Sequence, residues 1–275
     1  MKARTSNAAV LEQAWKNSRK SNSFKHGGYD FEVVEDHILE SMCRHNEDAS
    51  SCSKCLFANT LSLPELPEMV FPHNQLVISF SKFPGSCIRF NALDALKLVC
   101  PDKVPDIQVA PSVVWQESRK ELQMNGQAEP YDWTFTTKYS GTVENCKLEP
   151  SEETIDMERL KRQDPIAFYG FVTLYEDELA DHGCAKMEVR IRVMPTYFFV
   201  LVRFYLRVDR VLIRVCDTRL VGDNHANYMI REWSLREAKY EEVAHLPSNV
   251  LLDGNQVWQY LPVKEQEIVK IIPNA

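Results

Sequence analysis

Residues 211–220, VLIRVCDTRL, begin as an apolar strand pattern and end with charged side chains. Side chains of a strand alternate between its two faces, so Ile213 and Val215 are expected to share a face with Asp217 and Arg219. A carboxylate and a guanidinium at the end of an apolar face can form an internal salt bridge. They can also form the polar rim of a peptide-binding groove floored by valines. The residues alone leave both interpretations open.

Arginine dominates the charged positions around this strand. The segment 187–238 contains nine arginines, no lysine and six acidic residues, within a chain whose net charge is −7. The planar guanidinium binds carboxylates and phosphates through paired hydrogen bonds. The pattern indicates recognition of an acidic or carboxylate-ended ligand, although arginine side chains can also simply pack along a sheet.

A second candidate lies at 175–183, YEDELADHG, which combines several carboxylates with His182. Such a cluster can hold a metal ion or act as a general acid–base pair, which would suit a metal-dependent hydrolase. The alternative is structural, because DHG is also a good hairpin turn. No second metal motif and no Gly-rich phosphate loop accompanies it.

A third candidate combines Cys43 and His45 with the pair Cys52 and Cys55. These residue types suit zinc or a thiol-based sensor. The spacing is irregular and a second Cys-x-x-Cys hook is missing, so spare loop cysteines are the alternative. The favoured reading of the whole chain is a protein without cofactor, metal or catalytic residues.

The composition of the 275-residue chain is that of a globular protein, with 44% hydrophobic and 26% charged residues. No apolar run is long enough to span a membrane, and the negative net charge argues against nucleic acid and anionic membranes as partners. The eight scattered cysteines and the absence of a signal peptide indicate reduced thiols in the cytoplasm. Residues 1–28 are expected to be a flexible extension ending in a Gly-Gly hinge, followed by a single domain over 29–275, monomeric when free.

Alternating and aromatic-rich patterns predict consecutive strands between residues 171 and 220, joined by short turns. The strand expected at 197–208 returns through a two-residue turn at 209–210. This register places Val202 opposite Asp217, so that Asp217 and Arg219 end the face that contacts the core. The fold class is therefore α+β, with mainly antiparallel, sandwich-like β-sheets, an open cleft on one sheet and a few packed α-helices.

Many longer stretches resemble one known family, and they occur in the family's order. They are LPELPEMVFPHN, IRFNALDAL, WQESR, PYDWTFTT, YSGT, IDMERLK, YEDELADHG, IRVMPTYFFVLVRFYLRVD, VLIRVCDTRL, YMIRE and YLPVKE. The chain resembles the TIPRL family (TOR signalling pathway regulator-like, type 2A phosphatase-interacting proteins) from about residue 29 to 265.

The resemblance implies a non-enzymatic regulator that modulates phosphatases in TOR and stress signalling. Its implied partners are the catalytic subunits of type 2A, type 4 and type 6 Ser/Thr phosphatases, with a further phosphatase regulatory protein as a candidate third member of the complex. The phosphatase's C-terminal tail would enter a cleft on a β-sheet. The positions that match the tail site are Ile155, Val215, Asp217 and Arg219.

Two departures from the family pattern affect this site. Val215-Cys216 stands where the family usually has Met-Asn, which shortens one wall of the expected cleft. Arg210 replaces the usual Gly of the hairpin turn, which leaves the turn type open. Residues 1–28 and the Cys52–Cys55 segment have no recognised counterpart in the family, so the resemblance implies nothing about them.

Overall fold

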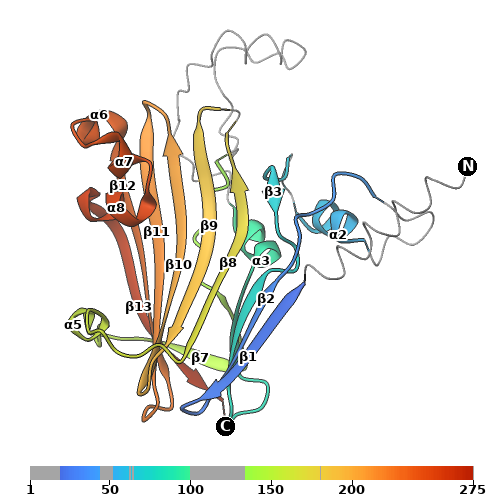
Figure 1. Ribbon diagram of the computed structural model, residues 1–275, viewed down its shortest axis with the longest axis vertical. Coiled ribbons are helices and arrows are strands. Elements are labelled where there is room, and N and C mark those ends of the chain that lie inside the picture. Colours follow the sequence, from blue (N-terminus) through green and yellow to red (C-terminus); the bar gives the residue numbers. More distant parts are fainter. Residues whose placement is uncertain are drawn as a thin grey trace, which may run out of the picture.

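The computed structural model describes residues 19–43, 52–61, 63, 65–99, 134–179 and 181–274. These residues form two antiparallel sheets with a few short helices, which confirms the α+β prediction (Figure 1). The smaller sheet has the order β1 (Lys20–His26), β2 (Tyr29–Glu35), β4 (Gln75–Phe80), β5 (Cys87–Asn91), β6 (Thr142–Glu144). The larger sheet has the order β3 (Met69–Val70), β8 (Phe168–Asp177), β9 (Gly183–Val193), β10 (Tyr197–Val208), β11 (Leu212–Asp223), β12 (Met229–Lys239), β13 (Val263–Pro273), β7 (Cys146–Pro150).

The helices lie at the edges and on the faces of these sheets. They are α2 (Ser53–Thr60), α3 (Ala92–Lys97), α5 (Met157–Leu160), α6 (Tyr240–Val243), α7 (Ser248–Leu251), α8 (Gly254–Val257) and the 3₁₀ turn η2 (Trp258–Tyr260). Asn91 caps α3 as its sequence predicts, since its side chain accepts a hydrogen bond from the Asp94 backbone N–H.

The main core lies between the two sheets. Strand β10 contributes its even-numbered residues, all apolar and buried, as the alternation in the sequence predicts. Phe198 packs edge-on against two aromatic residues of β2, with ring centroids 4.9 Å from Tyr29 and 5.1 Å from Phe31. Aromatic packing of this kind joins the sheets because each ring buries a large apolar area.

The register of β10 and β11 differs from the prediction by one residue. The turn comprises three residues, 209–211, with Arg210 in a left-handed conformation at φ +62°. Val208 therefore pairs with Leu212, and Arg203 rather than Val202 faces Asp217. A one-residue shift moves every side chain to the other face of the pair, so Asp217 and Arg219 do not end the main core face.

The opposite face of the larger sheet, here called the outer face, carries the odd-numbered residues of β10 and β11. A second apolar cluster forms there, where Val215 and Ile213 pack with Tyr205 beneath residues of α6–α8. Figure 1 shows α6–α8 and α5 near opposite ends of β10–β12, with the smaller sheet on the other side. The outer face is thus covered at two ends by separate segments.

The prediction of a flexible extension over residues 1–28 is wrong for its C-terminal part. Lys20–His26 form β1, which pairs with β2 along its whole length. Gly27 and Gly28, the expected hinge, are the two-residue hairpin turn, with φ of +62° and +88°. Phe24 of β1 also stacks on Phe168 of β8 at 5.4 Å. Residues 1–18 lie outside the described residues.

No helix among the described residues is both long and apolar enough to cross a membrane. Of the stretches that resemble the TIPRL family, WQESR lies outside the described part of the chain.

The aromatic contact between the sheets gives a stability prediction. Replacing the fully buried Phe198 with alanine should lower the free energy of unfolding by about 3–5 kcal/mol, because it removes the ring and leaves a cavity. The matched control is Tyr169→Ala on the outer face, where the side chain is 56% exposed and the change should be within about 0.5 kcal/mol. Urea unfolding of both variants measures the difference, and equal stabilities would contradict a shared core.

Candidate functional site

Asp217 lies in a buried, bidentate ion pair on the outer face. Arg203 of β10 directly opposes it, and the guanidinium donates to both carboxylate oxygens, with Nε–Oδ1 at 2.7 Å and Nη2–Oδ2 at 2.6 Å. Arg203 Nη1 also donates to the Gly254 carbonyl oxygen at 2.8 Å. The pair therefore joins two strands to the first residue of α8, and Asp217 is fully engaged by the protein itself.

Arg219 lies beside this pair and is bound far more loosely. Its Nη2 is 3.6 Å from Asp217 Oδ2 and its Nη1 is 4.0 Å from the sulfur of Met157 in α5. On its other side the guanidinium lies 4.8 Å from the centre of the Trp258 ring in η2. Arg219 thus stands between the two segments that cover the outer face, and within the described residues it makes no short hydrogen bond to an oxygen.

Trp258 is surrounded by cations. The guanidinium of Arg236 lies 5.1 Å from its ring centre and that of Arg203 lies 5.8 Å away, in addition to Arg219. Burial, and the positive charge of Arg219 and Arg203, lower the pKa of Arg236. Arginine nevertheless stays charged at neutral pH. With the one carboxylate of Asp217, the group carries an excess of two positive charges. We call these five residues, Arg203, Asp217, Arg219, Arg236 and Trp258, the outer-face site.

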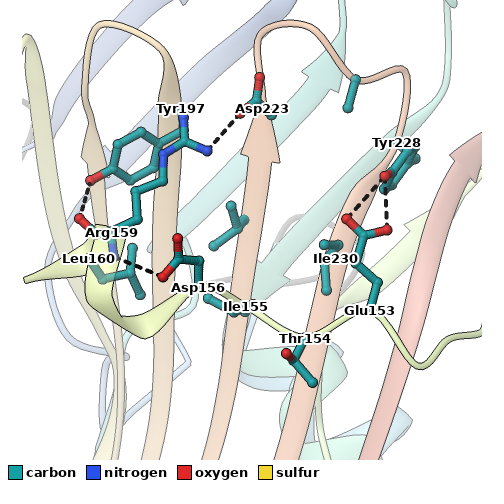
Figure 2. Close-up of a pocket in the computed structure, with 12 residues that line it drawn as sticks. Glu153, Thr154, Ile155, Asp156, Arg159, Leu160, Tyr197, Asp223, Tyr228 and Ile230 are labelled. Carbon is teal, nitrogen blue, oxygen red and sulfur yellow. Dashed lines mark hydrogen bonds and ion pairs between the residues drawn. The ribbon is translucent and has the colours of Figure 1, made fainter.

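A pocket of about 140 Å³ adjoins this site, between residues 153–160 and the ends of β10–β12 (Figure 2). Asp156 caps α5 by accepting hydrogen bonds from the backbone N–H groups of Glu158 and Arg159, both at 3.0 Å. The Ile155 backbone N–H donates to Glu232 Oε1 at 2.6 Å, and Glu232 is the strand neighbour of Arg219. The segment is thereby tied to the sheet next to the outer-face site.

Ion pairs and hydrogen bonds fix the two ends of the 153–160 segment. Arg159 bonds Asp223 at 2.7 Å and lies 4.1 Å from the centre of the Tyr197 ring. Although partial burial opposes ionisation, the His225 backbone N–H and Arg159 hold the pKa of Asp223 below its ordinary value.

At the other end, the Tyr228 hydroxyl donates to Glu153 at 2.9 Å. The hydrogen bond to that carboxylate raises the pKa of Tyr228. Lys270, 2.7 Å from Glu153, lowers the pKa of the carboxyl group. The pocket walls are therefore held in place by charged contacts at both ends.

The structure brings only part of the predicted set together. Ile155 lines the pocket but is itself 5% exposed. Asp217 and Arg219 lie in the outer-face site, whereas Val215 is buried beneath α6–α8 and offers no surface for a ligand. The expected partnership of Asp217 with Arg219 is also secondary, since the ion pair with Arg203 measures 2.6 Å and that with Arg219 measures 3.6 Å.

Sequence reasoning missed three residues of the site. Arg203 was hidden by the one-residue error in register, and the correct three-residue turn would have placed it opposite Asp217. Arg236 of β12 pairs with Val215 of β11, which places the Arg236 side chain on the outer face with Asp217. Trp258 comes after β12 and the three short helices α6–α8. No distinctive motif surrounds it, so nothing in the sequence indicated its position in the fold.

The cluster at 176–182 has structural roles in this fold. Asp177 accepts hydrogen bonds from the backbone N–H groups of Glu68 and Leu179, at 2.9 and 2.6 Å. Glu176 pairs with Lys186 at 3.3 Å. Within the described residues, these side chains do not form a group of three possible metal ligands. The geometry gives the hydrolase interpretation no support.

Comparison with known proteins establishes the family. The sequence model described as the TIP41-like family matches residues 69–244, most of the chain. The chain belongs to this family. A TIP41-like protein of Caenorhabditis elegans is 50% identical over 275 residues, covering 98% of this chain and 97% of that protein. This alignment also covers most of residues 1–28, for which the motifs alone had suggested no counterpart.

Two more distant relatives extend the comparison, and the name of the second one states a function. The human TIP41-like protein is 44% identical over 220 residues, covering 78% of this chain and 80% of that protein. A Saccharomyces cerevisiae protein named type 2A phosphatase activator TIP41 is 37% identical over 230 residues, covering 74% of this chain and 64% of that protein. These matches confirm the family membership that the motifs predict.

The buried ion pair predicts that substitutions of Asp217 and of Arg219 change the free energy of unfolding by different amounts. Asp217→Ala should lower the free energy of unfolding by about 3–5 kcal/mol, because it leaves Arg203 buried without its carboxylate. Arg219→Ala should cost less than about 1 kcal/mol, since its ion pair is long and partly exposed. Denaturant unfolding of both variants tests this, and an Asp217 variant as stable as wild type would contradict the assigned pairing.

Proposed function

We propose that this protein is a non-enzymatic regulator that binds catalytic subunits of type 2A-family Ser/Thr phosphatases through the outer-face site. The name of the yeast relative, type 2A phosphatase activator, supports the class of partner. The observation that carries the proposal is Arg219, a guanidinium held between Trp258 and Met157 with hydrogen-bonding capacity to spare. A protein surface that retains such a group next to a pocket is suited to an acidic ligand.

The chemistry favours a peptide end as the bound element. The surplus positive charge of the outer-face site complements a terminal carboxylate, and the guanidinium fork can bind both of its oxygens. Partly exposed apolar groups flank the site on both sides, with Met157 37% and Tyr260 51% exposed. These groups can pack against side chains of the peptide, while the charged groups fix its register. A C-terminal tail ends in such a carboxylate, and the phosphatase's C-terminal tail is therefore the proposed ligand.

Within this proposal, the segments on either side have different roles. The ion pair of Asp217 and Arg203 stabilises the floor of the outer-face site. The guanidinium groups of Arg219 and Arg236 face the ligand. Ile155 supports the pocket wall beside Glu232. Type 2A, type 4 and type 6 catalytic subunits are the proposed partners, and cytoplasmic TOR and stress signalling is the proposed setting. Binding would alter phosphatase activity or assembly without chemistry by this chain itself.

Arginine-to-alanine variants test the proposal. Arg219→Ala should weaken binding of the phosphatase catalytic subunit by about 2 kcal/mol or more, because the residue lies at the centre of the proposed interface. Ile155→Ala should cost about 1–3 kcal/mol through loss of the supporting wall. Calorimetry with the intact catalytic subunit measures both, and thermal melts confirm that each variant is folded.

The control is Arg89→Ala on the smaller sheet, where the arginine also forms one ion pair, with Glu144 at 3.2 Å, and its side chain is 37% exposed against 16% for Arg219. This variant should bind like wild type. A catalytic subunit lacking its C-terminal tail should lose the affinity difference between wild type and Arg219→Ala. If folded Arg219→Ala binds the intact subunit with unchanged affinity, the outer-face site is not where the phosphatase docks.

A further inference from the structure

Three cysteines converge at a place distant in the fold from the outer-face site. The sulfur atoms of Cys43, Cys52 and Cys55 all lie within 4.8 Å of one another, and those of Cys43 and Cys55 are 3.4 Å apart. None of the three belongs to a disulfide. Within the described residues, no other group of His, Cys, Asp and Glu brings three ligand atoms this close.

The local structure explains why the sulfurs meet. Cys52 is the N-cap of α2 and Cys55 lies one turn later, so the two side chains share a side of the helix. Phe57 anchors α2 because its side chain is buried in the main core. The chain before Cys43 is tied down in turn, since Lys54 of α2 donates to the Ser41 carbonyl oxygen. The cluster therefore joins the segment after β2 to α2.

Hydrogen bonds within the cluster affect the pKa values of its thiols. A hydrogen bond from the Cys55 backbone N–H lowers the pKa of Cys52, and hydrogen bonding with Cys43 raises the pKa of Cys55 to about 11. In the hydrogen bond between Cys43 and Cys55, one thiol supplies the proton that the other sulfur accepts. Metal ligation replaces such protons, because thiolates rather than thiols are the ligands.

We propose that Cys43, Cys52 and Cys55 form a zinc-binding site that fastens the segment after β2 to α2. Zinc–sulfur bonds of about 2.3 Å in a tetrahedral site require sulfur atoms roughly 3.8 Å apart. One pair of sulfurs is 3.4 Å apart and all three lie within 4.8 Å of one another, which is compatible with that value. Three thiolates are a soft ligand set, which selects zinc over magnesium or calcium. A water molecule would be the fourth ligand of the zinc ion.

Zinc titration of the reduced, chelator-treated full-length protein tests the site. Wild type should bind about one zinc ion per chain at high affinity, read against a competing chromophoric chelator. Cys43→Ser, whose side chain is exposed, should weaken binding on the order of 100-fold or more, since loss of supporting contacts alone can cost up to that much. Cys146→Ser, on β7 and outside the cluster, is the matched control and should bind like wild type.

Two further readouts separate a built site from incidental thiol binding. Zinc should raise the melting temperature of wild type and of Cys146→Ser, but not of Cys43→Ser, because only a ligand of the folded state stabilises it. The affinity should fall as the pH is lowered, since protons compete for the sulfurs. No zinc uptake by reduced wild type, equal uptake by Cys43→Ser, or zinc binding without a change in melting temperature would overturn the proposal.

Discussion

The buried pair of Arg203 and Asp217 holds the outer face together. It closes β10 onto β11 with two short hydrogen bonds and reaches α8 through the Gly254 carbonyl oxygen. Removing either partner leaves an unpaired charge in a buried position, which costs far more than breaking an exposed ion pair. This interaction therefore fixes the start of α8, and with it the approach to Trp258, above the apolar cluster that Val257 forms with Tyr205.

In this arrangement, the residues that stabilise the outer face differ from the residues proposed to bind the ligand. Arg203 binds Asp217 at 2.6 Å, whereas Arg219, beside Trp258 with Arg236, lies 3.6 Å from that carboxylate. The 153–160 segment is fixed independently by Arg159 with Asp223 and by Glu153 with Tyr228. The two covering segments thus have separate supports in the same sheet, and Arg219 contacts both segments.

The alternation of apolar residues in β9 and β10 was sufficient to predict an antiparallel sheet and the side of β10 that enters the core. It was not sufficient to predict the register with β11, because that depends on whether the turn has two or three residues. Arg210 adopts a left-handed conformation that glycine usually occupies, which the sequence pattern did not reveal. The same limit applied at Gly27-Gly28, read as a hinge but forming a tight hairpin turn.

The site residues show the same division. Asp217 and Arg219 could be identified because charges interrupt an apolar strand, and both lie in the site. Arg203 was missed because its place opposite Asp217 depends on the register of β10 with β11. Trp258 could not be identified, since its role arises only when α8 and the turn after it pack on the outer face. Val215 follows the strand pattern correctly, but helices that are distant in sequence cover it. Local periodicity reports which side of a strand a residue occupies, and not what packs against that side.

Hydrogen exchange of the protein alone and bound to a phosphatase catalytic subunit tests the central claim most directly. Binding through the outer face should slow exchange of backbone amides in residues 153–160 and 254–260, because the ligand would lie between these two segments. Amides of β4 and β5 in the smaller sheet should be unchanged and serve as the internal reference. Protection confined to the smaller sheet or to α2, with none in 153–160 and 254–260, would contradict the account.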